Sequence, residues 1–301
     1  MNACFAVAFG FLLALSAPAQ AADKGMGIAK PWQINFQDAV SPVMERIESF
    51  HELLFWIITV ITLFVLALLI YVIVKFNEKA NPVPSKTTHN TLIEVIWTVV
   101  PIVILVVVAV PSFKLLFFYN KHENPDMTLK VIGQQWYWSY EYPDHGKFAF
   151  DSQMIEKDKL KPGQPRLLAV DNEVVLPVDT NIRLIYASED VIHNWAMPSM
   201  GLKQDTVPGR INENWVRITR EGDYYGQCSE LCGVRHAFMP IHIRAVSKQD
   251  FADWVKTAQK KFAKADGSPA DPVQVAVDAS TGKLITVTHP GPDKVAQAAN
   301  R

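Results

Sequence analysis

The chain has 301 residues, of which 49% are hydrophobic, and a formal net charge of -1 at pH 7. This length is sufficient for a membrane section and one soluble domain of ordinary size. Without a global excess of basic residues, nothing favours nucleic-acid binding. The three cysteines, Cys4, Cys228 and Cys232, are too few for a disulfide framework.

Residues 1–22 are typical of a secretory signal peptide, although no Lys or Arg precedes the apolar stretch. Residues 5–15 are apolar, and Ala19 and Ala21 form a small-residue cleavage site before Ala22. Cleavage would remove Cys4. Residues 23–52 are predicted to form an exposed lead-in, with an interfacial helix near residues 43–50.

Two uncharged stretches predict a transmembrane helical hairpin over residues 53–119. Residues 53–74 and 95–113 carry no charge, and each stretch is long enough to cross a bilayer core of about 30 Å as a helix. Pro101 and Pro111 are tolerated in membrane helices whose neighbours satisfy the freed carbonyls.

Lysines in the connecting loop predict the orientation of this hairpin. Under the positive-inside rule, Lys75, Lys79 and Lys86 place the loop in the cytoplasm and both flanking parts outside. Glu94 begins the second helix. Composition alone favours a solvated carboxylate stabilised by the helix dipole, but a carboxylate at a membrane edge also admits protons to a pathway.

Residues 120–263 are predicted to form an all-β sandwich or barrel that ends in an amphipathic helix. Apolar and polar residues alternate in several short segments with turn signals between them, namely residues 129–142, 166–170, 182–187, 215–219 and 239–246. Ser247 is the expected N-cap of a helix whose apolar residues follow at helical spacing: Phe251, Trp254, Val255, Ala258 and Phe262. Residues 264–301 are predicted to be a loosely ordered tail, in which residues 273–278 and 283–288 are placed to pair.

The densest set of metal-binding side chains follows the spacing Cys-x3-Cys-x3-His-x2-Met: Cys228, Cys232, His236 and Met239. Soft sulfur ligands with imidazole suit copper, and Met is rarely a zinc ligand. A disulfide in an oxidising compartment is the alternative, but it leaves His236 and Met239 without a role. His193, 35 residues before Cys228 and at a strand edge, is the best candidate for a further ligand. His242, inside a strand, is interpreted as structural.

These motifs resemble subunit II of the haem–copper cytochrome c oxidases over roughly residues 40–250. The resemblance rests on GQQWYWSYEY at 133–142, DVIHNW at 190–195, GLKQDTVPGR at 201–210 and the Cys loop. It implies a cupredoxin-like domain holding a dinuclear CuA copper centre that is bridged by Cys228 and Cys232. The other copper ligands that it implies are His193, His236, Met239 and the main-chain carbonyl of Glu230. Such a centre carries electrons and leaves no coordination position open for substrate.

The same resemblance implies roles outside the copper shell. Trp136 would receive the electron from a c-type cytochrome, the Glu230 side chain would bind magnesium shared with subunit I, and Glu94 would help open a proton path of subunit I. Oxygen reduction to water, with proton pumping, would take place in subunit I. The expected location is the bacterial inner membrane, as a multi-pass protein with the N-terminus and copper domain on the periplasmic side.

Residues 171–230 contain ten acidic and five basic side chains, a formal charge of -5. Complementary charge speeds encounter and orients partners, so we expect the donor to be a basic c-type cytochrome. The candidates for docking lie in the segments that bear Trp136 and His193, namely Glu141, Asp144, Glu189 and Asp190.

Three other functions were weighed against this one. A copper-delivery or thiol-redox assembly protein also uses Cys-x3-Cys with a distant His, but such proteins usually have a thioredoxin-like α/β pattern, a single anchor and no counterpart of Met239. Quinol-oxidase subunits resemble this fold but lack the copper ligands. A fused cytochrome c domain would need Cys-x-x-Cys-His, which does not occur in the sequence, so no haem is expected in this chain.

Overall fold

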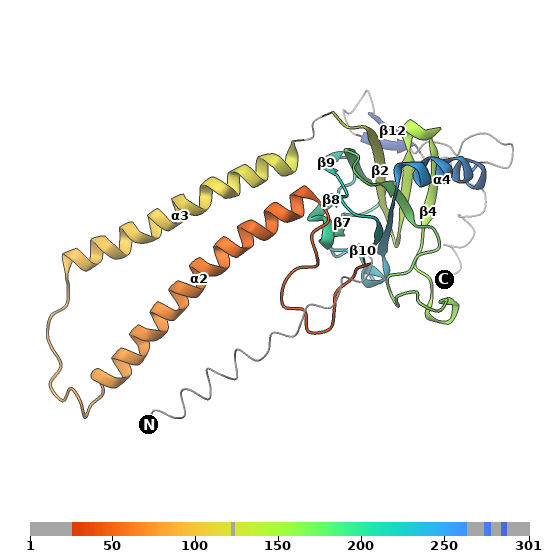
Figure 1. Ribbon diagram of the computed structural model, residues 1–301. Helices are drawn as coiled ribbons and strands as arrows, with labels where there is room; N and C mark the ends of the chain where they lie inside the picture. Colours follow the sequence, from red (N-terminus) through yellow and green to blue (C-terminus); the bar gives the residue numbers. More distant parts are fainter. Residues whose placement is uncertain (1–25, 122–123, 264–273, 278–283, 288–301) are drawn as a thin grey trace.

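The computed structural model describes residues 26–121, 124–263, 274–277 and 284–287. A hairpin of two long helices extends away from a β domain, and a shorter helix packs against that domain (Figure 1). The predicted signal peptide and most of the predicted tail lie outside the described residues.

The two long helices are α2 (Pro42–Lys75) and α3 (Thr91–Asn120), and both are long and apolar enough to cross a membrane. The hydroxyl of Ser41 caps α2 by accepting from the amide of Met44 at 3.1 Å, and Asn90 caps α3 in the same way. The interfacial helix predicted near residues 43–50 is continuous with α2. The reason is that no Gly or Pro interrupts residues 43–75.

The β domain consists of two sheets. The first has the order β5-β11-β10-β7-β8 with β1 added to β10, and the second has the order β4-β3-β2-β6-β9. The first sheet contains β1 (Met26–Gly27), β5 (Val174–Pro177), β7 (His193–Met197), β8 (Leu202–Thr206), β10 (Gly222–Cys228) and β11 (Pro240–Val246). The second contains β2 (Met127–Gln134), β3 (Tyr137–Tyr142), β4 (Phe148–Ser152), β6 (Ile182–Ser188) and β9 (Asn212–Val216).

Large aromatic side chains fill the space between the sheets. Trp138, Tyr140 and Tyr142 alternate with smaller or polar residues on β3 and are fully buried. Trp136 lies in the turn between β2 and β3 and is not part of this buried set. The predicted alternation over residues 129–142 is therefore two antiparallel strands with a turn between them.

Residues 166–170 do not form the predicted strand. The amides of Leu168 and Ala169 both donate to the carbonyl of Pro165, and Leu167 has a φ of 67°. These features make a turn, since a positive φ is incompatible with a strand. Only Val170 pairs, in an isolated bridge with Met154.

Hydrogen bonds connect both helices of the hairpin to the β domain. Next to α2, the amide of Val40 donates to the carbonyl of Ser199 at 2.9 Å, and the hydroxyl of Ser41 donates to the carbonyl of Met200 at 2.7 Å. At the end of α3, the indole of Trp215 donates to the carbonyl of Phe118 at 3.0 Å. The position of the β domain over the hairpin is thus set by specific polar contacts.

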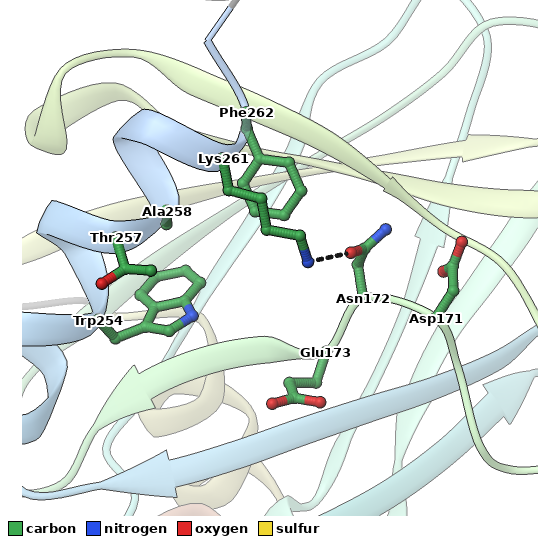
Figure 2. A pocket seen from close by; sticks show the side chains of 8 residues that line it. All are labelled: Asp171, Asn172, Glu173, Trp254, Thr257, Ala258, Lys261 and Phe262. Atoms are coloured by element: carbon green, nitrogen blue, oxygen red, sulfur yellow. Dashed lines mark hydrogen bonds between the residues drawn. The ribbon is translucent and has the colours of Figure 1, made fainter.

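The predicted C-terminal helix is α4 (Lys248–Lys261), capped by Ser247. It buries Phe251, Val255 and Ala258 against the domain, as the helical spacing predicted. Its last turn lines a shallow pocket in which Lys261 donates to the side chain of Asn172 at 2.8 Å (Figure 2). Within the predicted tail, β12 (Gln274–Val277) and β13 (Leu284–Val287) pair antiparallel. This confirms the predicted pairing of residues 273–278 with residues 283–288.

Candidate metal centre

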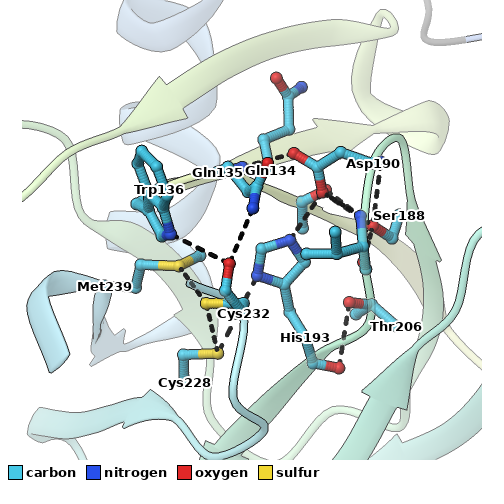
Figure 3. Close-up of polar contacts among 12 residues, drawn as sticks. Gln134, Gln135, Trp136, Ser188, Asp190, His193, Thr206, Cys228, Cys232 and Met239 are labelled. Atoms are coloured by element: carbon cyan, nitrogen blue, oxygen red, sulfur yellow. Dashed lines mark hydrogen bonds and ion pairs between the residues drawn. The ribbon is translucent and has the colours of Figure 1, made fainter. Parts of the chain in front are cut away.

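Two neighbouring strands of the first sheet bring the predicted ligands together. His193 is the first residue of β7, Cys228 is the last residue of β10, and these antiparallel strands pair at Cys228 and Trp195. The loop after β10 carries Cys232, and Met239 directly precedes β11. The ligands predicted from distant parts of the sequence therefore meet at one end of the sandwich (Figure 3).

The sulfur and nitrogen atoms of this group face one another at short distances. The thiol sulfurs of Cys228 and Cys232 are 3.8 Å apart, well beyond the 2.0 Å of a disulfide. Nδ1 of His193 lies 4.0 Å from the Cys228 sulfur. The Cys232 sulfur lies 3.6 Å from Nδ1 of His236 and 3.5 Å from the Met239 sulfur. These sulfur and imidazole donors form one cluster, and donors of this kind suit copper.

Asp190 orients His193. Its Oδ1 lies 2.8 Å from Nε2 of His193, so the other ring nitrogen, Nδ1, is the one directed at the thiols. Backbone amides of Gln135 and Val191 each donate to the Asp190 carboxylate at 2.6 Å and fix it in turn. Sequence reasoning placed Asp190 among the docking residues and missed this role, although an Asp three residues before the His was a signal for it.

The ring of His193 is fully buried between strands, and Gly133 makes room for it. A Cβ atom at Gly133 would lie 2.7 Å from Cδ2 of the imidazole, closer than any real contact. Residue 133 on β2 must therefore be glycine for the ring to occupy this position.

The pKa values of His193, Cys228 and Cys232 depend on their burial and on the charged and polar groups around them. Burial disfavours the charged form of His193, but hydrogen bonds to Asp190 and Cys228 outweigh it and raise the pKa to about 9. Burial likewise opposes ionisation of Cys228, but the imidazole of His193 and the amide of Asn194 lower its pKa to about 7. For Cys232, burial and the neighbouring Cys228 charge raise the pKa to about 12. The imidazole of His193 thus favours ionisation of Cys228, and that charge in turn opposes ionisation of Cys232.

Side chains from the turn between β2 and β3 hold the Cys loop in place. The side chain of Gln135 donates to the carbonyl of Cys232 at 2.8 Å, and the indole of Trp136 donates to the same carbonyl at 3.1 Å (Figure 3). Gly233 follows with a φ of 120° and leaves space for the indole ring. Trp136 thus lies directly against the Cys loop and is half-buried.

The remaining predicted residues lie in different surroundings. The carbonyl oxygen of Glu230 is 3.3 Å from the Cys228 sulfur, while the Glu230 side chain is exposed. Glu94 accepts from the amide of Asn90 at 3.2 Å at the start of α3, which gives it a helix-capping contact. His242 pairs with Asp223 at 2.8 Å and stacks on Tyr225, in agreement with a structural role.

The structure contradicts one of the predicted docking residues, Glu141, and places another, Asp144, at a distance from Trp136. Glu141 is 4% exposed and pairs with Lys130 at 3.2 Å, so it presents no charge to a partner. Asp144 is exposed but binds the amide of Thr128, six residues along β2 from Gln134 and thus about 20 Å away. Both residues were predicted because they share a segment with Trp136. The prediction for Glu141 is wrong because its side chain is buried, and Asp144, exposed but distant from Trp136, is not retained in the proposal below.

Comparison with known proteins identifies the family. Residues 127–246 match the family model of the periplasmic domain of cytochrome c oxidase subunit II, and residues 29–115 match that of its transmembrane domain. A probable cytochrome c oxidase subunit 2 of Rickettsia bellii is 53% identical over 238 residues, which cover 79% of this chain and 88% of that protein. The chain belongs to the cytochrome c oxidase subunit 2 family.

Other members of the family are also similar to this chain over most of their own length. Subunit 2 of Zea mays is 50% identical over 233 residues, covering 75% of this chain and 90% of that protein. The crystal structure of the periplasmic domain of subunit II from Bradyrhizobium japonicum is 56% identical, covers 48% of this chain and 100% of its own, and has a TM-score of 0.45.

The predicted membership of subunit II is thereby confirmed, and so is the predicted fold of two membrane-length helices, a β-sandwich and a C-terminal helix. The thioredoxin-like α/β pattern expected of an assembly protein is not found in the described residues, where two β-sheets form the soluble domain.

Proposed function

We propose that this chain is the subunit through which electrons enter a terminal respiratory oxidase, at a CuA centre. One observation carries the proposal: His193, Cys228 and Cys232 bring their ligand atoms within 4.8 Å of one another in a buried site. Met239 and His236 extend this set on the side of Cys232. Two thiolates, two imidazoles and a thioether match copper far better than a hard metal ion.

The distance between the thiols supports a bridged pair of ions. Metal–thiolate bonds are about 2.3 Å long, so the sulfurs at 3.8 Å are close enough for one ion to contact both. Cys228 and Cys232 would therefore both hold the copper pair. His193 lies near Cys228 and His236 lies near Cys232, at opposite ends of the site. Each of the two ions would therefore have one imidazole ligand.

When bound, the copper pair would supply reversible one-electron chemistry. The chain holds the donor atoms rigidly, because Asp190 fixes His193 while Gln135 and Trp136 fix the Cys loop. A rigid, buried donor set changes little between two oxidation states, which favours rapid electron transfer over activation of a substrate. The indole of Trp136, against the Cys232 carbonyl, connects the surface to the site and is the proposed point of electron acceptance.

The electron donor is proposed to be a c-type cytochrome, and the acceptor a haem in subunit I, where oxygen would be reduced to water with proton pumping. Glu189 and Asp190 remain as docking carboxylates, since the Glu189 amide donates to the carbonyl of Gly133 and the Gln135 amide donates to Asp190, both on the segment that leads to Trp136. The exposed apolar side chains of Leu231 and Val234, on the Cys loop itself, offer an additional contact surface for partner subunits.

Two further roles are proposed with their tests. The exposed carboxylate of Glu230 is suited to a magnesium ion shared with subunit I. Replacement of Glu230 by Gln should abolish the EPR signal of manganese bound in place of magnesium; an unaffected signal rejects the role.

Glu94, at the loop end of α3, is proposed to admit protons to subunit I. Glu94→Ala should slow turnover of the complex and leave the copper spectrum intact. If turnover is unchanged, Glu94 has no role in proton entry and only caps the start of α3.

The proposed location is the bacterial inner membrane, crossed by both α2 and α3, with the copper domain in the periplasm. Its support is the match to transmembrane and periplasmic family domains, together with Lys75 at the end of α2 and two lysines in the loop between the helices. A cysteine introduced at Ser85, in that loop, should be shielded from an impermeant thiol reagent in intact cells. Labelling from outside would reverse the assigned orientation.

The copper assignment is tested by loading the full chain with copper and recording its stoichiometry and EPR spectrum. Two ions per chain and a seven-line hyperfine pattern are expected, since one electron would be shared by two copper nuclei. One ion with a four-line pattern would instead indicate a mononuclear site and reject CuA.

A further inference from the structure

The loop that leads into α2, residues 28–39, carries the most exposed large apolar side chains of the described residues. Trp32 and Ile34 are each 98% exposed, and Phe36 is 45% exposed. Single apolar side chains are common on protein surfaces, but several together mark a site of interaction. Three such side chains within five residues therefore indicate that an apolar surface covers this loop.

Both ends of the loop are fixed to the β domain. At its start, Met26 and Gly27 form β1 and pair with β10. At its end, the amide of Val40 donates to the carbonyl of Ser199 at 2.9 Å. Between these two attachments the loop projects from the β domain and lies next to the first turns of α2 (Figure 1).

A contact between Phe36 and His51 sets the level of the loop along α2. The two rings meet edge-on, with centroids 4.9 Å apart. His51 precedes Leu53, the first residue of the uncharged stretch 53–74, by about 3 Å along the helix axis. When this stretch crosses the hydrocarbon core, Phe36 lies in the headgroup layer, which is about 5–7 Å thick on each side.

The apolar surface of the loop continues onto α2. The ring centroid of His51 also lies 6.4 Å from that of Phe55, and Phe55 meets Trp56 edge-on at 5.8 Å. Phe55 and Trp56 are both exposed. Aromatic side chains are enriched at this level in membrane proteins, where they form a belt around the edge of the apolar stretch. The loop adds Trp32 and Phe36 to this belt.

Hydrogen bonds within the loop hold Trp32 close to Phe36. The amide of Gln33 donates to the carbonyl of Lys30 at 3.1 Å, and the amide of Lys30 donates to the side-chain oxygen of Gln33 at 2.9 Å. The side-chain amide of Gln33 donates in turn to the carbonyl of Phe36. Trp32 has a φ of 61°, a conformation that bulky residues rarely adopt. The turn therefore presents Trp32 in a fixed position and satisfies several of its own backbone groups, which lowers the cost of leaving water.

The charges around the loop favour an apolar attachment over an electrostatic one. Lys30 pairs with Asp38 at 3.8 Å. The first turns of α2 carry three glutamates and one arginine, namely Glu45, Glu48, Glu52 and Arg46. Because anionic headgroups attract clusters of basic residues, this region has no excess of positive charge to bind them.

The size of the patch distinguishes a lipid surface from a protein partner. One Trp, one Ile and a half-exposed Phe offer on the order of 400 Å² of apolar surface. This is about half of the roughly 800 Å² that each partner contributes to a stable protein interface. Insertion into a bilayer depends on the apolar area that is buried and needs no matching surface.

We propose that this loop inserts Trp32 and Ile34 into the lipid layer at the boundary between headgroups and acyl chains, in the leaflet next to the β domain. The loop is then a third attachment of the β domain to the membrane, in addition to the two helices. The proposal rests on the membrane location proposed above for α2 and α3, and it does not depend on copper.

The first test measures the depth of Trp32 in phosphatidylcholine vesicles that contain the full chain. The tryptophan emission lost in Trp32→Tyr is the contribution of Trp32. Lipid brominated near the headgroup end of its acyl chains should quench this contribution by about twofold, because interfacial indoles lie next to that part of the lipid. Bromine near the chain ends should quench it less, and added phosphatidylglycerol should not change the result.

Trp56→Tyr is the matched control, since Trp56 lies within the uncharged stretch of α2. Circular dichroism verifies that both variants are folded. Quenching of Trp56 without quenching of Trp32 would overturn the insertion of the loop and leave the membrane span intact. Quenching of neither would overturn the membrane location itself, and the proposal with it.

The second test identifies what contacts the loop in the assembled oxidase. A photoreactive benzoylphenylalanine in place of Ile34 should, on irradiation in the membrane, yield this chain with a phospholipid attached. The control places the same residue at Ala252, which is exposed on α4, on the side of the β domain opposite the hairpin (Figure 1). That variant should yield no lipid adduct. Attachment of a second polypeptide at position 34 would overturn the proposal in favour of a protein contact, and so would the absence of any adduct, in favour of a loop in water.

Discussion

The ion pair between Asp190 and His193 decides which ring nitrogen is left for a metal. Because Nε2 is bound to the carboxylate, Nδ1 is the nitrogen that faces Cys228. A carboxylate in this position fixes the tautomer of a ligand histidine and increases its basicity. The Asp190 side chain is 29% exposed, but three hydrogen bonds hold it on the ring and on the neighbouring backbone.

Replacing Asp190 by Asn should lower copper affinity by about 10- to 100-fold, the usual cost of losing such a partner. The amide retains the shape of the side chain but not its charge, so His193 is held less firmly. Affinity is measured by competition with a chelator. Asp144→Asn is the control, because Asp144 also accepts a backbone amide but lies far from the site. Equal affinities in both variants would show that Asp190 does not support the metal site.

The two thiols should titrate in very different ranges in the copper-free chain. The pKa of Cys228 is lowered to about 7 and that of Cys232 is raised to about 12. Since only a thiolate attacks a disulfide reagent, the rate at Cys228 should rise as pH increases through about 7 and then level off. Cys232 should remain slow up to pH 9. Peptide mapping after timed labelling separates the sites, and equal rates at pH 7 would contradict this assignment.

The convergence of the proposed copper ligands could be predicted at the residue scale, because residue type and spacing indicate a metal site. Cys228, Cys232, His236 and Met239 are close in sequence, and a loop of this length cannot separate them widely. The contact of Asp190 with His193 and the burial of Glu141 depend instead on how the strands pair in the folded domain. Pairing of Glu141 with Lys130 across two strands is a matter of register, which residue types alone do not specify.

At the scale of elements, the site depends on close contact between β7 and β10. These strands pair only at Gln227 with Ala196 and at Cys228 with Trp195. Gly226 lies just before this short contact. A Cβ atom there would be 1.9 Å from the carbonyl oxygen of Ala196, a backbone atom that cannot move alone.

Gly226→Ala should therefore force the two strands apart, destabilise the β domain by about 3 kcal/mol and abolish copper binding. Unfolding by urea and the copper absorption spectrum measure the two effects. Gly163→Ala is the control: its φ is +87°, but no atom lies within 4 Å of the new Cβ. It should cost about 1 kcal/mol of strain and leave copper binding unchanged. A full copper spectrum in Gly226→Ala would disprove the close-contact argument.

β6 and β11 were predictable from sequence because one face of each meets the core and the other meets polar surroundings, whereas the short β4, which alternates in the same way, was not predicted. β6 and β11 alternate in burial in this way, and their predicted ranges agree with the structure to within about two residues. β5 and β7 were missed because every residue in them is buried, so no alternation exists. The predicted strand at 166–170 failed for the converse reason, since Pro165 begins a turn there.

At the scale of the whole molecule, charge near the metal site should govern the encounter with a cytochrome. Exposed charges are screened over about 10 Å at 0.1 M salt, so only carboxylates close to Trp136 contribute. Glu189 adjoins this region through its amide, which bonds the carbonyl of Gly133 at 3.3 Å. Asp144 is about 20 Å from the same end of β2.

In the assembled oxidase, Glu189→Gln should therefore lower the association rate with a basic c-type cytochrome and flatten its dependence on ionic strength. Asp144→Asn, the matched removal of one distant charge, should change neither quantity. Trp136→Phe should leave association intact and slow electron transfer into copper, because the indole contacts the Cys232 carbonyl but carries no charge. Stopped-flow kinetics over a salt series separates these effects, with the copper spectrum of each variant as a check on folding. If Glu189→Gln keeps the original salt dependence, docking depends on the exposed apolar side chains Leu231 and Val234 of the Cys loop rather than on charge.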